Sequence, residues 1–136
     1  CMWSVIFAPI DGVFETPYQS SPLDLQTDSF SIVRSKLIRA RLSEIEKGRA
    51  SDLISLADDR ERPRQTWVIG VRWDDYSKKE LLEIVECLGG HAVATICRMF
   101  SEEFEHRTGG IPDLCLWKPD ESEIMFVEVK GMNQRP

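Results

Sequence analysis

Apolar residues recur at helical spacing over most of residues 23–108. The clearest stripe predicts a helix over about 28–47, with Gly48 as its stop, and a shorter helix is expected over about 51–60, ended by Pro63. The apolar face of the first helix consists of Phe30, Val33, Leu37, Ile38, Leu42 and Ile45. This part of the chain is therefore expected to be helical and to bury one side of each helix.

Two more helices are predicted in the second half of this region. Ser77-x-x-Glu80 has the form of a capping box and opens a helix that Gly89-Gly90 should end. Another helix is expected over about 92–106, with Gly109-Gly110 after it.

Three other segments have weaker patterns. Residues 1–8 fit the end of a helix or a buried strand, and residues 9–22 read as a loop. The segment 66–73 is rich in β-branched and aromatic residues, which favours a strand over an apolar helical turn.

The pattern changes to extended chain over residues 109–131. Residues 114–117 form a continuous apolar run, as expected for a strand buried on both faces, and 118–122 form a polar turn. Residues 124–130 then alternate, which places Glu128 and Lys130 on one face of a second strand. The two strands are close enough in sequence to pair as an antiparallel hairpin.

Composition bounds the class of protein. The chain has 136 residues, 42% hydrophobic and 29% charged, which fits a single globular domain. No apolar run approaches the roughly 20 residues that cross a bilayer, so no membrane contact is expected. The net charge of −6 argues against a general nucleic-acid coat. The basic runs over 34–49 and 60–64 are interpreted as solvated helix faces.

The predicted hairpin brings Asp113, Glu128 and Lys130 towards one place. Hydrolysis of a phosphodiester needs charge stabilisation at phosphorus and an activated water, and Mg²⁺ binds carboxylate and phosphate oxygens. Asp113 and Glu128 would supply carboxylates and the carbonyl of Val129 a third oxygen. Lys130 would lie beside the attacking water and orient it.

A purely structural interpretation is also open. Glu128 and Lys130 could form an exposed salt pair, and Asp113 could be a turn residue after a proline. Two features favour the site. Charged groups at the end of a buried strand are costly unless they are used. Gly110 and Gly131 flank the trio and would let a polymer backbone approach closely.

Three groups of residues carry a family resemblance. They are Gly-Gly-Ile-Pro-Asp-Leu-Cys-Leu-Trp over 109–117 with Phe-Val-Glu-Val-Lys-Gly over 126–131, Pro-Leu-Asp-Leu-x-Thr-Asp-Ser-Phe over 22–30, and Cys-Leu-Gly-Gly over 87–90. Together they resemble the VRR-NUC branch of the PD-(D/E)xK nucleases, and within it the C-terminal nuclease region of a DNA-repair enzyme. The resemblance covers nearly the whole chain.

The resemblance implies a fold and a site. The fold is expected to be α/β, a restriction-endonuclease-like mixed sheet flanked by helices, of which residues 1–136 are a segment truncated at both ends. The family's metal-binding aspartate falls on Asp113, its glutamate on Glu128 and its catalytic lysine on Lys130. A further glutamate is expected on a helix preceding Cys1, and another helix after Pro136.

The resemblance also implies an activity. It implies a structure-specific DNA endonuclease that uses Mg²⁺ or Mn²⁺, prefers 5′ flaps, has 5′-to-3′ exonuclease activity and acts in interstrand-crosslink repair in the nucleus. Partners would be branched DNA and, through regions outside this chain, ubiquitinated repair proteins. His106 and Arg107 could contact a DNA phosphate. The alternatives are a degenerate nuclease fold used for DNA binding or protein docking, and a dimeric Holliday-junction resolvase of the same superfamily.

Overall fold

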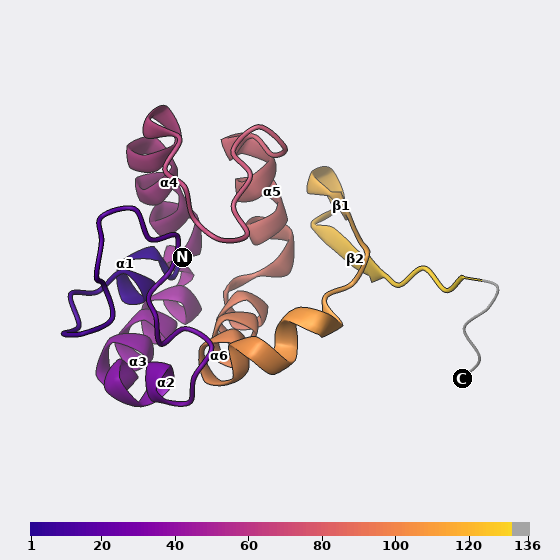
Figure 1. The fold of residues 1–136 in the computed structure, drawn as a ribbon. Helices are drawn as coiled ribbons and strands as arrows, with labels where there is room; N and C mark the ends of the chain where they lie inside the picture. The colour runs from indigo at the N-terminus through magenta and orange to yellow at the C-terminus, as the bar shows by residue number, and fades with distance from the viewer. Residues whose placement is uncertain (132–136) are drawn as a thin grey trace.

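A group of helices lies on one side of the molecule and a two-stranded hairpin on the other (Figure 1). The computed structural model describes residues 1–131, so residues 132–136 of the predicted domain lie outside the described part. The elements are α1 (Trp3–Ile6), α2 (Ser29–Val33), α3 (Ser35–Glu44), the π turn η1 (Ile45–Arg49), α4 (Ala50–Glu61), α5 (Lys78–Leu88), α6 (Gly90–Arg107), β1 (Leu114–Lys118) and β2 (Glu123–Val127). Within residues 1–131 no helix is both long and apolar enough to span a membrane.

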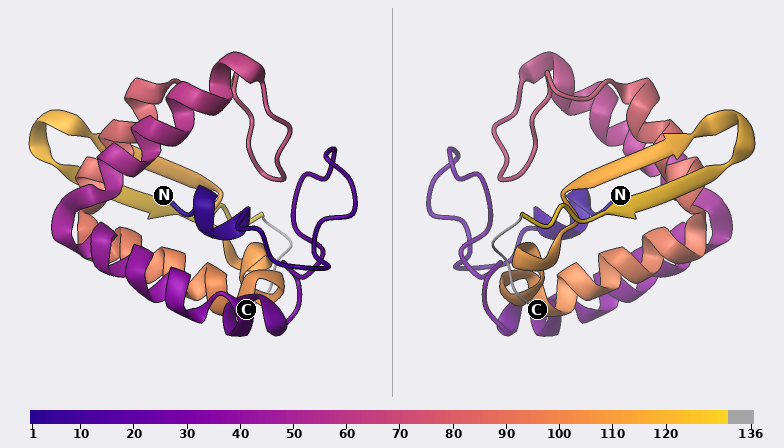
Figure 2. Two further views of the ribbon diagram at one scale, coloured as in Figure 1. Left: turned by 90° about the vertical axis from the view of Figure 1, so that its left-hand side faces the viewer. Right: turned by 90° about the vertical axis from the view of Figure 1, so that its right-hand side faces the viewer.

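The helix predicted over 28–47 is divided in two. Arg34, with φ −105° and ψ 11°, separates α2 from α3. Gly48 has φ +90° inside η1, a value that glycine adopts without strain. Helical structure resumes at α4, so Gly48 bends the helical region and is not the helix stop that the sequence predicted. Figure 2 shows the result, in which α3 and α4 form the two arms of a V.

The glycine pair between α5 and α6 has two physical roles. Gly89 has φ +79° and ends α5, as predicted, whereas Gly90 is the first residue of α6. A Cβ atom at Gly90 would lie 2.6 Å from the carbonyl oxygen of Ile45. Only glycine therefore lets the start of α6 approach the backbone of η1 this closely.

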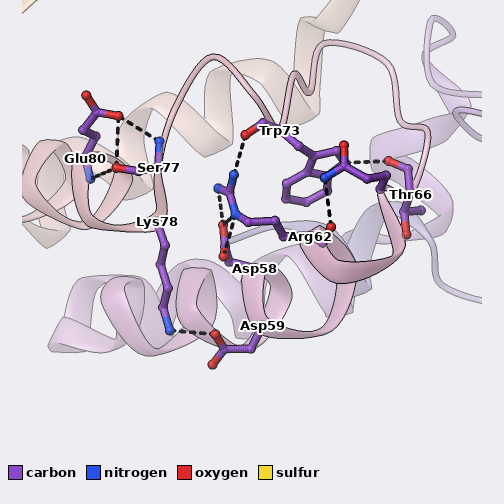
Figure 3. Close-up of polar contacts among 9 residues, drawn as sticks. Asp58, Asp59, Arg62, Thr66, Trp73, Ser77, Lys78 and Glu80 are labelled. Atoms are coloured by element: carbon purple, nitrogen blue, oxygen red, sulfur yellow. Dashed lines mark hydrogen bonds and ion pairs between the residues drawn. The ribbon is translucent and has the colours of Figure 1, made fainter.

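The segment 66–73 is a loop, so the predicted strand is wrong. No strand among residues 1–131 lies beside it, and side chains from η2 (Arg62–Arg64) and α4 hold it instead (Figure 3). Arg62 binds both carboxylate oxygens of Asp58, donates to the carbonyl of Trp73 and stacks over the Trp73 ring at 5.3 Å. The Trp73 indole in turn donates to the carbonyl of Thr66 at 2.8 Å.

The core contains a buried ion pair that the sequence did not indicate. Arg34 was assigned to a solvated basic run, but it is fully buried. Its Nη1 lies 2.6 Å from Asp24 Oδ2, its Nε donates to the carbonyl of Val5 at 3.1 Å, and its guanidinium lies over the Phe30 ring. Arg34 therefore joins α1, the segment 22–25 and the start of α3 within one core.

Around this ion pair lies one cluster of buried apolar residues. It joins α1, α2, α3, η1, α4 and α6 and consists of Val5, Leu25, Phe30, Ile38, Leu42, Ile45, Ala50, Val93 and Ala94. Four of them, Phe30, Ile38, Leu42 and Ile45, belong to the apolar face predicted for residues 28–47, whereas Val33 and Leu37 of that predicted face are exposed.

Replacing Asp24 by alanine should strongly destabilise the fold. The change leaves the Arg34 guanidinium buried without its carboxylate, which costs about 3–5 kcal/mol. Asp52→Ala removes the partner of Arg49 in a pair with both side chains more than half exposed, and should cost only about 0–1 kcal/mol. Urea denaturation of the two variants measures the difference, and equal losses would contradict the proposed role of the buried pair.

Candidate nuclease site

The hairpin aligns the two halves of the predicted motif. β1 and β2 are antiparallel, with Leu114 opposite Val127 and Lys118 opposite Glu123. Asp113 directly precedes this paired region and Glu128 directly follows it, so the two residues lie at the same end of the hairpin. The Val129 N–H donates a hydrogen bond to Asp113 Oδ2 at 2.7 Å. The aspartate that precedes β1 is thereby held against the segment that follows β2.

One detail of the predicted hairpin is wrong. β2 ends at Val127, so Glu128 and Lys130 follow the strand instead of lying within it. The Asp113 hydrogen bond supplies the reason. The amide of Val129 bonds to a carboxylate side chain and not to a carbonyl of the opposite strand, so the backbone ladder stops there. Asp113, Glu128 and Lys130 are all exposed.

The expectation that β1 is buried on both faces is also wrong for the described structure. Leu114 and Leu116 are each 49% exposed, whereas Cys115 and Trp117 on the other face are partly buried. Within residues 1–131 the sheet has two strands, and α5 packs against only one of its faces. The apolar run of β1 thus has one covered face and one open face.

Two residues that the sequence analysis missed fix the hairpin to α5. The Trp117 indole N–H, one residue before the end of β1, donates to Glu83 Oε2 in the middle of α5 at 3.1 Å. Lys79 lies 3.6 Å from the other oxygen of Glu83. The signal available in the sequence was a tryptophan on the covered face of β1, because a partly buried indole N–H usually has an acceptor.

The start of α5 is fixed in turn to α4 (Figure 3). Ser77 and Glu80 form the predicted capping box, with Ser77 N–H donating to Glu80 Oε2 at 2.8 Å and Glu80 N–H to Ser77 Oγ at 3.2 Å. Hydrogen bonds from the backbone and then the side chain of Ser77 lower the pKa of Glu80. Lys78 Nζ lies 2.7 Å from Asp59 on α4. The candidate site is therefore connected to the helical core through α5.

The donor set suits a hard divalent cation. Asp113 and Glu128 offer carboxylate oxygens, the ligands that Mg²⁺ and Mn²⁺ prefer. Within residues 1–131 no three His, Cys, Asp or Glu side chains are grouped closely enough to hold an ion by themselves. Two carboxylates plus a backbone oxygen fit a cation that keeps several waters or takes phosphate oxygens. The assignment of Asp113, Glu128 and Val129 as ligands and Lys130 as catalytic residue stays a prediction.

The two predicted phosphate contacts lie at the end of α6. Arg107 is bound to Glu103 one helical turn earlier, with Nη2 and Oε2 2.8 Å apart and both side chains about half exposed. Such a pair is weak, so a phosphate could replace the carboxylate. His106 lies in acidic surroundings, in a small pocket that Asp28 and Glu102 also line. The phosphate role of His106 and Arg107 stays a prediction.

Comparisons with known proteins place the chain in a family. The sequence pattern of the VRR-NUC domain matches residues 45–135. The chain is 43% identical over 133 residues to the Fanconi-associated nuclease 1 homolog of Schizosaccharomyces pombe, covering 98% of this chain and 19% of that protein. It is 35% identical over 137 residues to human Fanconi-associated nuclease 1, covering 98% of this chain and 14% of that protein. The chain thus spans less than a fifth of the length of either nuclease.

A solved structure is similar over the same extent. The crystal structure of paFAN1 bound to a 5′-flap DNA of 2 nt with a gap matches with a TM-score of 0.86 and 28% identity, covering 98% of this chain and 24% of that chain. The chain therefore belongs to the VRR-NUC family of nuclease domains, and its resemblance to the nuclease region of the Fanconi-associated nucleases is confirmed. The expected partial restriction-endonuclease-like α/β fold is confirmed as well.

Glu83→Ala should loosen the hairpin. It leaves the indole N–H of Trp117 without its acceptor, a loss of about 1 kcal/mol, so the amides of β1 and β2 should exchange hydrogen roughly fivefold faster. Glu83→Gln keeps an acceptor and should stay near wild type. Glu121→Ala, which removes an exposed partner of Lys118, is the matched control. Unchanged exchange in Glu83→Ala would refute the role of this bond.

The capping box predicts how the start of α5 responds to acid. Because the folded pKa of Glu80 is lowered, its contribution to stability is present above the ordinary glutamate pKa and is lost as pH falls through the lowered value. Amide protection factors in the first turn of α5 should fall over that acidic range. In Glu80→Gln, which does not titrate, they should show no such step.

Proposed function

We propose that this chain is the catalytic segment of a metal-dependent, structure-specific DNA nuclease. The observation that carries the proposal is the hydrogen bond between Val129 N–H and Asp113 Oδ2, at 2.7 Å. It joins two motif halves 16 residues apart, and the side chains of Asp113, Glu128 and Lys130 are all exposed. Membership of the VRR-NUC family supports the same activity.

In this proposal each residue of the trio has one chemical task. Asp113 and Glu128 hold Mg²⁺ or Mn²⁺, with the Val129 carbonyl as a third donor. When bound, the ion supplies Lewis-acid stabilisation of the phosphate and lowers the pKa of a water. Lys130 places an ammonium beside the attacking water and the phosphate oxygens, where it orients the nucleophile and stabilises negative charge. Asp113 also fixes the segment that carries Glu128 and Lys130, through its bond to Val129.

The proposed substrate, exonuclease activity and biological setting are based on the relatives. Proteins similar to this chain are named Fanconi-associated nucleases, and paFAN1 was solved with 5′-flap DNA. On that basis the substrate class is branched DNA with a 5′ flap, with 5′-to-3′ exonuclease trimming, and the setting is interstrand-crosslink repair in the nucleus. Contacts with ubiquitinated repair proteins would belong to regions outside this chain.

Cleavage of a 5′-flap duplex by the intact protein tests the site. Asp113→Asn, Glu128→Gln and Lys130→Ala should each lower the single-turnover rate by about 100-fold or more. Asp120→Asn and Glu121→Gln in the exposed turn between β1 and β2, and Lys118→Ala at the exposed end of β1, make the same chemical changes and should retain activity. Wild-type rates in any of the three site variants would refute that residue's assignment.

The same experiment separates the alternatives. A wild-type protein that binds the flap but does not cut it with either Mg²⁺ or Mn²⁺ would favour a docking or DNA-binding module. Preferential cleavage of four-way junctions by a dimer would favour a resolvase. Cleavage of the flap by a monomer supports the proposed nuclease.

A further inference from the structure

We infer that the exposed side of α3 and η1 is a second DNA contact, which binds the phosphate backbone of a duplex arm away from the scissile bond. The inference rests on the proposed function. Three cations, Lys36, Arg39 and Lys47, define the surface and are named the α3 cation row. All three side chains are exposed.

The α3 cation row is distinguished by the lack of acidic partners. Most Lys and Arg side chains within residues 1–131 form an ion pair with Asp or Glu. The exceptions in this part of the chain are Lys36, Arg39, Lys47, Arg64 and Lys130. Lys130 belongs to the proposed catalytic site, and three of the other four lie on α3 and η1. In a chain of net charge −6, this is a local excess of free positive charge.

The spacing of the row suits a nucleic-acid backbone. Arg39 and Lys47 follow Lys36 by 3 and 11 residues, close to one and three helical turns, so the three side chains share one side of the helix. At about 1.5 Å per residue the row is roughly 16 Å long. One DNA strand has a phosphate about every 3.4 Å along the axis, so the row can meet several phosphates of the same strand.

A groove beside the row adds further donors. A cavity of about 440 Å³ lies between α3 and α6, and Arg39, Arg98, Ser31 and Ser35 are among its lining residues. Arg98 is only loosely paired with Glu46, at 3.8 Å and with both side chains nearly half exposed. Guanidinium and hydroxyl groups are the usual phosphate contacts of DNA-binding proteins. Glu102 also lines the cavity, so the part suited to phosphate is the α3 side.

The position of the row excludes a direct role at the scissile phosphate. α6 runs beside α3 and lies between it and the hairpin (Figures 1 and 2). A strand bound along α3 is therefore separated from Asp113 and Lys130 by the width of a helix. The row would hold a duplex arm in place, which affects DNA affinity and its dependence on salt but not the chemical step.

The salt dependence of DNA binding tests this inference. Binding of a 5′-flap duplex to the intact protein is measured by fluorescence anisotropy in EDTA, over a range of salt concentrations. Log affinity falls as log salt rises, and each lost phosphate contact makes this negative slope shallower by about 0.9. The triple variant Lys36→Ala/Arg39→Ala/Lys47→Ala should therefore have a slope shallower by roughly 2 to 3. It should also bind more weakly at low salt, and its rate of cleavage at saturating DNA should be unchanged.

A matched control removes the same total charge elsewhere. Arg49→Ala/Arg60→Ala/Arg72→Ala replaces three arginines that are more than half exposed but ion-paired. Its slope should change by less than that of the row variant. Single variants Lys36→Ala and Lys47→Ala, each expected to lose about 0.9, provide the measurement if the triple variant folds poorly.

The outcomes separate this inference from the proposed function. A row variant with the wild-type slope, or a control variant with an equal loss, overturns the DNA contact while flap cleavage by the wild type still supports the nuclease. A wild-type protein that neither binds nor cuts the flap refutes both.

Discussion

The register of the β1–β2 hairpin is the constraint on which the candidate site depends. Side chains alternate between the two faces of a strand, so a shift of one residue would turn the Asp113 side chain away from the Val129 amide that it binds. The pairing of Leu114 with Val127 sets the register, and the Asp113 side chain then closes the open end of the hairpin by binding Val129 N–H. One carboxylate thus ends the strand pairing and holds the segment that carries Glu128 and Lys130 against the start of β1.

The hairpin is too small to hold this geometry alone. A two-stranded antiparallel pair is at best marginally stable by itself in water, so its position comes from packing against a helix. That helix is α5, which binds Trp117 through Glu83 at its middle and α4 through Lys78 at its start. The helical core therefore acts on the site through contacts that lie outside the motif.

Much of the helical part could be predicted because its signals are local. The Ser77–Glu80 capping box and the apolar stripe of α3 depend on residues three or four positions apart. The predicted strand over 66–73 failed because β-propensity is realised only beside a pairing partner. No such strand lies beside this segment in residues 1–131, and Arg62 with Trp73 holds it as a loop.

By itself, the sequence determined most of the helical region, the antiparallel hairpin and the residue types of the family motif, because periodicity, caps and residue types are properties of neighbouring positions. Only the tertiary structure decided that Arg34 is buried with Asp24, that β2 ends before Glu128, and that Glu83 holds Trp117. Each of these outcomes depends on contacts between segments far apart in the chain. A charged residue in a basic run has the same local pattern on a surface or in a core, and only the partner that folding brings to it decides between them.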